Sequence, residues 1–207
     1  MPRLLIATHN HHKAAEIRAL LPGHWEVTDL REVAPDAVPE ETGQTFADNA
    51  ALKAVAGSRL SAALVLADDS GLEVEALHGD PGVRSARYAG DAADDAANRA
   101  RLLRELAAVR TPGFNPVARF CCVIALARAG KVLATVEGVV EGTIADRERG
   151  TGGFGYDSLF VPQGSDRTFA ELPASEKNRI SHRARALQKI VPILEGVGGK
   201  ASVPCAS

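Results

Sequence analysis

The sequence predicts an α/β protein built on a mixed β-sheet with flanking helices. Strand-like and helix-like segments alternate in the first half of the chain, and two long strand-like segments follow each other around a short turn in the second half. Alternation favours parallel pairing whereas a hairpin is antiparallel, so one sheet should contain both. The chain has 207 residues, of which 45% are hydrophobic and 24% charged. This is enough for a single domain with a sizeable core, or for two small lobes that share a sheet.

The positions of the expected elements follow from apolar periodicity and from turn residues. In chain order they are a strand at 3–8, a helix at 11–21, a strand at 26–30, a loop at 31–44, a helix at 45–63, a strand at 64–67, a short strand at 72–77, a loop at 78–90, a helix at 91–109, strands at 117–129 and 132–144, a glycine-rich loop at 150–157, a strand at 159–161 and a helix at about 181–194. Thr45 is the expected N-cap of the second helix, with Asp48 in a capping-box position. Ser181 should cap the last helix, and Pro192 should kink or end it.

Chain organisation and composition narrow the class of protein. We expect one domain over 1–196 and a flexible tail at 197–207, which is rich in small residues. The formal net charge is −2, so the basic surface that binds nucleic acid is absent. No apolar run reaches the roughly 20 residues that cross a membrane, and the three cysteines form no disulfide framework. The expected location is the cytoplasm.

The segment where the first strand turns into the first helix is a candidate phosphate site. It reads Thr8-His9-Asn10-His11-His12-Lys13. The N–H groups at a helix N-terminus carry partial positive charge and attract anions, and Lys13 would add a full charge. The alternative is an ordinary capped helix in which Lys13 pairs with Glu16. The histidines lack the neighbouring cysteine ligands typical of structural zinc, so zinc is not expected.

Two pairs of adjacent carboxylates are candidate magnesium ligands. Glu40 and Glu41 lie in the loop before the second helix, and Asp68 and Asp69 follow a strand. Mg²⁺ prefers one or two carboxylates together with substrate phosphates. Adjacent carboxylates repel, so a nearby cation or a raised pKa is expected. For the Asp pair we favour function over a capped turn; the Glu pair alone is better explained as solvated loop residues.

A polar stripe runs along the second predicted helix. Thr45, Asn49 and Lys53 recur every four residues and therefore share one face. Such a stripe usually faces solvent, and the alternative directs Lys53 into a carboxylate-lined cleft. The spacing does not decide between these two interpretations.

Two further segments could contact a nucleobase. The loop Gly150-Thr151-Gly152-Gly153-Phe154-Gly155-Tyr156-Asp157 combines glycines, which let backbone approach a ligand, with two rings that could stack on a base. Its plain alternative is a hairpin loop. Lys177 and Ser181-His182-Arg183 form a cationic cluster that could read a purine edge. By themselves, these residues are better explained as the capped, exposed start of a helix.

In combination, these segments resemble the inosine/xanthosine triphosphate pyrophosphatases, a family that acts on non-canonical purine nucleoside triphosphates. The resemblance lies in Ala7-Thr8-His9-Asn10 with Lys13 and Glu16, Glu41-Thr42-Gly43 with Thr45-Phe46, Asn49-Ala50 and Lys53-Ala54, Ala67-Asp68-Asp69-Ser70-Gly71-Leu72, Ser85-Ala86-Arg87-Tyr88, Gly152-Gly153-Phe154-Gly155-Tyr156-Asp157, and Glu176-Lys177 with Ser181-His182-Arg183. Each piece is weak alone, but their order from Leu4 to about Leu194 is specific.

The resemblance implies an elongated mixed α/β fold with two lobes around a central substrate cleft, usually in a homodimer. It also implies Mg²⁺-dependent hydrolysis of ITP, dITP or XTP to the monophosphate and pyrophosphate. In the first part of the chain, the resemblance implies that residues 8–13 bind the phosphates, that Asp69 is catalytic and binds the metal, and that Glu40 or Glu41 also binds the metal. Lys53 and Asp68 would support the reacting phosphates. The nucleotide site would contain Ser70 and Phe154-Gly155-Tyr156-Asp157, and the base would be contacted by Lys177, His182 and Arg183.

The sequence departs from the family pattern at two positions, and two other functions stay open. His9 stands where the family often has glycine, and Ser158 stands where proline is common. One alternative is a Maf-like pyrophosphatase for modified or pyrimidine nucleotides, against which the Ser181-His182-Arg183 segment argues. The other is a nucleotide-binding module without catalysis. The intact charged residues Lys13, Lys53, Asp68 and Asp69 argue against that module.

Overall fold

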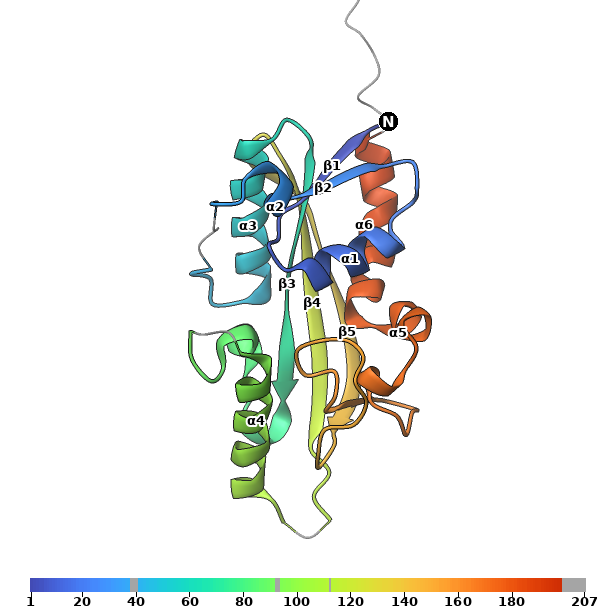
Figure 1. The fold of residues 1–207 in the computed structure, drawn as a ribbon. Helices are drawn as coiled ribbons and strands as arrows, with labels where there is room; N and C mark the ends of the chain where they lie inside the picture. The colour runs from blue at the N-terminus through green and yellow to red at the C-terminus, as the bar shows by residue number, and fades with distance from the viewer. Residues whose placement is uncertain (38–40, 92–93, 112, 199–207) are drawn as a thin grey trace, which may run out of the picture. The chain divides into compact units, whose positions relative to one another are not determined.

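The computed structural model describes residues 1–37, 41–91, 94–111 and 113–198, and the chain forms two compact units (Figure 1). The first unit contains the described residues of Met1–Asp69, Val123–Glu137 and Ala184–Ser207, and the second contains those of Ser70–Cys122 and Gly138–Arg183. Within the described ranges, none of the helices has the length and apolar character needed to cross a membrane.

In the described part of the chain, the strands form one six-stranded sheet in the order β2-β1-β3-β4-β5-β6. They are β1 (Arg3–Ile6), β2 (Glu26–Asp29), β3 (Leu64–Val74), β4 (Val117–Arg128), β5 (Lys131–Ile144) and β6 (Phe160–Pro162). β1 pairs in parallel with β2 and β3, whereas β5 pairs antiparallel with β6. The predicted mixed sheet is therefore confirmed.

The helices follow the predicted order, with two additions. They are α1 (His11–Leu20), α2 (Leu30–Val33), α3 (Phe46–Leu60), α4 (Asp95–Val109), α5 (Ala174–Ile180) and α6 (His182–Gly198), with 3₁₀ turns η1 (Glu75–Leu77), η2 (Gly82–Arg87) and η3 (Phe169–Glu171). The capping box of Thr45 and Asp48 at the start of α3 is confirmed. The prediction of a loop throughout 31–44 was wrong because α2 covers residues 31–33. The sequence does not predict α5, because so short a helix shows no apolar periodicity.

Strand β3 corrects the prediction of two short strands separated by a turn. It runs without a break from Leu64 to Val74, so Asp68, Asp69, Ser70 and Gly71 lie inside it. Asp, Ser and Gly are typical turn residues, which made the segment look like a strand end. Successive side chains of a strand point to opposite faces, so the carboxylates of Asp68 and Asp69 leave β3 on opposite sides.

Helix α6 continues through Pro192 and reaches Gly198. The helix does not end at Pro192, so that part of the prediction is wrong. Residues 197–198 of the predicted tail are helical. Proline removes one helical hydrogen bond, but Ile190 and Leu194 on either side are fully buried. Their packing holds the helix together. The rest of the predicted tail, 199–207, lies outside the described residues.

Helix α3 lies very close to the strands of the first unit. A Cβ added at Gly57 would lie 3.0 Å from the Ala7 Cβ and 3.0 Å from a methyl of Val65. Figure 1 shows α3 on one side of β1 and β3, with α6 on the other. Lys53 lies one helical turn before Gly57 and shares its face, so the close packing at Gly57 directs Lys53 toward the strands.

Asp29 is a buried carboxylate at the end of β2. Its side chain accepts a hydrogen bond from the Arg31 backbone N–H at 3.0 Å and lies 2.9 Å from the Arg18 guanidinium and 2.7 Å from that of Arg31. Burial alone would raise its pKa, but the hydrogen bonds and charges of the two arginines outweigh burial and lower the pKa.

Asp29→Asn should therefore lower the free energy of unfolding by about 1–3 kcal/mol at pH 7. A carboxylate with a lowered folded-state pKa stabilises the fold fully above its unfolded pKa of about 4, and this contribution disappears as the pH falls through the folded-state value. The deficit of the variant should shrink below pH 4, as urea unfolding from pH 7 to pH 3 will measure. Asp36→Asn, at an exposed position, is the control; a deficit that stayed constant down to pH 3 would contradict the prediction.

Candidate active site

The N-terminus of α1 is capped by its own side chains. The Asn10 side-chain oxygen accepts hydrogen bonds from the backbone N–H groups of His12 and Lys13 at 3.0 and 3.1 Å. Thr8 Oγ1 accepts from the Asn10 N–H at 3.1 Å. These contacts match the cap of the ordinary-helix alternative, in which the cap satisfies the first N–H groups; its expected Lys13–Glu16 pair is not what the structure shows at Lys13, whose Nζ pairs with Asp68. Phosphate binding at this turn stays a prediction.

The histidines of this turn make local contacts. His9 Nε2 lies 2.7 Å from the Ala37 carbonyl oxygen, which ties the turn to the segment after α2. The rings of His11 and His12 contact each other, with centroids 3.8 Å apart, and both residues are exposed. His9 therefore has a tethering contact that the glycine common at this position of the family would lack.

Lys13 reaches the first carboxylate of β3. Its Nζ lies 3.3 Å from Asp68 Oδ2. The Asp68 side chain has no exposed surface, and that of Lys13 is 16% exposed. The structure therefore brings together two residues that are 55 positions apart in the chain, and it leaves the amine of Lys13 partly open to solvent.

Lys53 joins the second carboxylate of β3 to Glu41. Its Nζ donates to Asp69 Oδ1 at 2.7 Å and to Glu41 Oε1 at 2.8 Å. Asn49, one turn earlier on α3, donates from Nδ2 to Asp69 Oδ2 at 3.3 Å and accepts from the Gly43 N–H at 2.8 Å. Both Asn49 and Lys53 are buried. Asn49 and Lys53 of the polar stripe therefore face carboxylates, whereas Thr45 is exposed.

The charges of this cluster do not cancel. When all are ionised, Glu41, Asp68 and Asp69 exceed Lys13 and Lys53 by one negative charge. Burial raises the pKa of Asp69, and the two lysines offset this only in part. Burial would lower the pKa of Lys53, but the charges of the three carboxylates outweigh it and raise that pKa. The surplus negative charge means that additional positive charge would stabilise the cluster.

The donor set suits a hard divalent cation. Glu41 and Asp69 contact the same ammonium, so the two carboxylates are near enough to share one ion. Mg²⁺ takes one or two carboxylates, with phosphates and water completing its shell. Glu40, the other predicted ligand, lies outside the described residues. Among the residues that are described, no group of three His, Cys, Asp or Glu side chains could hold a metal by itself.

The second unit contains a buried cationic cluster. Lys177 Nζ donates to Asp157 Oδ2 at 2.6 Å and lies 5.1 Å from the centre of the Phe154 ring. The Arg183 guanidinium lies 5.8 Å from the same ring and donates to Ser70 Oγ at 3.0 Å. Lys177 is 5% exposed and Arg183 is 1% exposed. The expectation that these cations are exposed at a helix start was wrong.

The other residues predicted near the base take different places. The His182 ring stacks on Phe120, with centroids 4.7 Å apart and planes 10° apart. Tyr156 belongs to the hydrophobic core, and its hydroxyl donates to the Ser85 carbonyl at 2.8 Å. This burial leaves Phe154 as the better-placed ring for base stacking. Ser158, where proline was expected, donates to Glu148 at 3.0 Å.

The glycine-rich loop is shaped by Asp157. The Phe154 N–H donates to Asp157 Oδ2 at 2.9 Å, and Gly153 has φ of 72°. A Cβ at Gly153 would lie 2.0 Å from Asp157 Oδ2, so only glycine allows the carboxylate to reach both Phe154 and Lys177.

The sequence did not indicate the roles of two buried asparagines, Asn49 and Asn98. The sequence assigned no role to Asn49, although its side chain donates a hydrogen bond to Asp69. Asn98 of α4 was not considered; it is buried, donates to the Ala86 carbonyl at 3.1 Å and accepts from the Ala89 N–H at 2.6 Å. A buried asparagine needs such partners, but burial is not visible in a single sequence.

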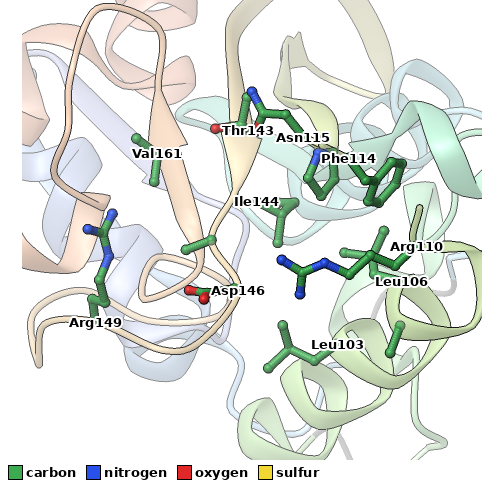
Figure 2. Close-up of a pocket in the computed structure, with 13 residues that line it drawn as sticks. Leu103, Leu106, Arg110, Phe114, Asn115, Thr143, Ile144, Asp146, Arg149 and Val161 are labelled. Carbon is green, nitrogen blue, oxygen red and sulfur yellow. The ribbon is translucent and has the colours of Figure 1, made fainter. Parts of the chain in front are cut away.

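A separate pocket of the second unit contains none of the predicted site residues. It has a volume of about 360 Å³. Its lining residues are Leu103, Leu106, Ala107, Arg110, Phe114, Asn115, Pro116, Thr143, Ile144, Ala145, Asp146, Arg149 and Val161. Figure 2 shows the Arg110 side chain extending into this space toward Asp146. The pocket is therefore distinct from both clusters described above.

Comparison with known proteins assigns the chain to a family. The dITP/XTP pyrophosphatase of Geobacillus kaustophilus is 50% identical over 204 residues, covering 97% of this chain and 98% of the relative. That of Bacillus licheniformis is 46% identical over 196 residues, covering 94% and 99%. A HAM1 protein from Coxiella burnetii has a similar structure, with a TM-score of 0.84 at 40% identity, covering 95% of this chain and all of the other. The family model matches residues 4–193, and the chain therefore belongs to the Ham1 family.

Proposed function

We propose that the protein hydrolyses non-canonical purine nucleoside triphosphates, namely ITP, dITP and XTP, to the monophosphate and pyrophosphate, and so removes them from the nucleotide pool. The observation that carries this proposal is the buried Asp69 carboxylate, held by Lys53 and Asn49 beside Glu41. Such an arrangement suits phosphoryl chemistry, in which positioning and charge stabilisation dominate. The names of the relatives, dITP/XTP pyrophosphatase, support the substrate class.

In the proposed reaction, Asp69 orients a water molecule or takes its proton for attack on phosphorus. Lys13 and Lys53 stabilise the negative charge that grows in the transition state. Asp68 holds Lys13 in place through the contact at 3.3 Å. Asp69 and Glu41 would hold Mg²⁺, with Glu40 as a further candidate, and the bound ion would offset phosphate charge. The turn from Thr8 to Lys13 would bind the phosphates.

We propose that the cationic cluster of the second unit selects the base. A 6-oxo purine presents an acceptor at O6 that Arg183 can meet with an N–H. Adenine presents a donor there and would leave the buried guanidinium without that bond, at a cost of about 1–3 kcal/mol. Phe154 offers a ring for stacking, and Lys177, His182 and Ser70 complete the proposed nucleotide site.

A product assay tests the function. The protein should convert ITP and XTP to the monophosphate and pyrophosphate in MgCl₂, with ATP at least about 10-fold slower. EDTA should abolish turnover and excess Mg²⁺ should restore it. Release of orthophosphate would show that a different bond is cut. Preference for dUTP or a modified pyrimidine triphosphate would favour the Maf-like alternative, and no turnover of any triphosphate would favour a binding module.

We further propose that the protein acts as a homodimer in the cytoplasm. The family resemblance supports the dimer, and the absence of a disulfide pattern in the sequence supports a reducing compartment. Light scattering coupled to gel filtration would test the first proposal: a mass equal to one chain of 21.7 kDa at working concentration would contradict it. A tagged chain located by fractionation would test the second.

A further inference from the structure

Two side chains of helix α4 hold the glycine-rich loop through the backbone N–H and carbonyl oxygen of Gly155. Asp95, in the first turn of α4, accepts a hydrogen bond from the Gly155 N–H at 2.7 Å. Arg99, one turn later, donates from Nη1 to the Gly155 carbonyl oxygen at 2.9 Å. The two side chains share a helix face because they are four residues apart. Together they hold the backbone of Gly155, which has φ of 59°, in the left-handed region that favours glycine.

Arg99 is itself held in place. Its Nε donates to Glu148 Oε2 at 2.8 Å, and the same carboxylate oxygen accepts from Ser158 Oγ at 3.0 Å. Only 18% of the Arg99 side chain is exposed. The planar guanidinium donates in fixed directions, so its two hydrogen bonds restrict the Arg99 side chain to one conformation. Arg99 therefore joins α4 to residues on both sides of the glycine-rich loop.

The position of Gly155 controls the ring that precedes it. Phe154 is bonded directly to Gly155, and Asp157 holds it as well: the Asp157 side chain accepts from the Phe154 N–H at 2.9 Å, and the Asp157 N–H donates to the Phe154 carbonyl oxygen at 3.2 Å. Tyr156, on the other side, is fixed in the core through its hydroxyl. The conformation of Gly155 therefore helps to set where the backbone presents the Phe154 ring relative to Lys177. Asp95 and Arg99 hold that conformation through the Gly155 N–H and carbonyl oxygen.

We infer that Asp95 and Arg99 are positioning residues that set Phe154 against Lys177 and Arg183 and thereby tune the selection of the base. This inference rests on the proposed function. The contacts of Asp95 and Arg99 are with Gly155 and Glu148, which belong to the same unit, so their loss should affect recognition of the base and spare the chemical step.

The fold does not depend on these two side chains. Asp94 caps α4 by accepting from the Ala96 N–H at 2.9 Å, and Leu102 and Leu106 anchor the helix in the core. Asn98 provides a separate tie from α4 to Ala86 of η2 and to Ala89 after it. Removal of Asp95 or Arg99 should therefore leave α4 folded and change mainly the loop that carries Phe154.

The experiment compares Arg99→Ala and Asp95→Ala with the conservative Asp95→Asn, whose side-chain oxygen can still accept from Gly155. Arg104→Ala is the matched control, because Arg104 lies on the same helix with 72% of its side chain exposed. Both alanine variants should raise KM for ITP about 10-fold with kcat within about 3-fold, and should lower the preference for ITP over ATP about 10-fold. Inhibition by inorganic tripolyphosphate, which has no base, should not change.

Asp95→Asn and Arg104→Ala should behave like the parent enzyme. An unchanged KM and unchanged ITP preference in both alanine variants would overturn the inference, as would equal weakening of tripolyphosphate inhibition. Failure of the proposed function is a separate result, because it would appear as absence of pyrophosphate release from ITP by the parent enzyme. In that case, calorimetric binding of IMP decides. Weaker binding by Arg99→Ala and Asp95→Ala, with Arg104→Ala unchanged, supports the inference, and unchanged binding by both alanine variants overturns it.

Discussion

Replacing Asp69 with asparagine should reduce kcat for ITP by about 10²–10⁴-fold, the usual contribution of a general base. Asparagine keeps the size of the side chain and can still accept from Lys53, but it cannot take a proton or balance a divalent cation. The carboxylate lies at the meeting point of Lys53 and Asn49, with a raised pKa. Steady-state release of pyrophosphate measures the effect, and circular dichroism checks the fold.

Two controls make the Asp69 result specific. Asp36→Asn removes an exposed carboxylate from the same unit and should leave kcat unchanged. Asp69→Glu restores the charge at a displaced position and should recover part of the activity. Turnover by Asp69→Asn within a few-fold of the parent, in a folded protein, would remove Asp69 from the catalytic role.

Replacing Lys53 with methionine should destabilise the protein by about 3–5 kcal/mol, because the change leaves buried carboxylates without their cation. The Lys53 side chain is only 9% exposed, and its ammonium contacts both Asp69 and Glu41. Methionine keeps most of the apolar stem, so the loss reports mainly on charge. Urea unfolding measures this change, and kcat should fall as well because a charge facing the proposed reaction is lost.

A double-mutant cycle separates charge from packing at Lys53. If the cost comes from an uncompensated carboxylate, Lys53→Met combined with Asp69→Asn should be less destabilised than the sum of the single variants. Lys131→Met, at an exposed position of β5, controls for the loss of a lysine. A Lys53→Met variant as stable as the parent, or strict additivity in the cycle, would contradict this account.

Most elements could be predicted because their signals are local. The helix that begins after Thr45 has a capping box and a long apolar face, and the hairpin between β4 and β5 turns at Ala129-Gly130, both with positive φ. Strand β3 was misjudged because turn-forming residues in its middle are held by pairing and by distant lysines. Such tertiary contacts override local preference, and a single sequence does not display them.

The candidate site could be predicted in part, for a related reason. A Lys53 directed toward carboxylates was one of two interpretations of the α3 stripe, and its burial beside Asp69 decided between them. The cations Lys177 and Arg183 were expected at the surface because charged residues usually lie there. Their burial depends on Asp157 and Ser70, which are far away in the chain. The family resemblance assigns both residues to the nucleotide site, and that role stays a prediction.

Asn49 and Lys53 both point inward from α3, and this constrains the number of residues in the first half of the helix. Asn49 and Lys53 reach Asp69 because they are one turn apart, and Gly57 continues the same line into its contact with the strands. Each residue advances an α-helix by about 100°. A single inserted or deleted residue between Asn49 and Lys53 would swing one of the two away from the carboxylate, whereas added residues beyond Gly57 would leave both in register. We therefore expect length variation in this helix to be tolerated only at its C-terminal end.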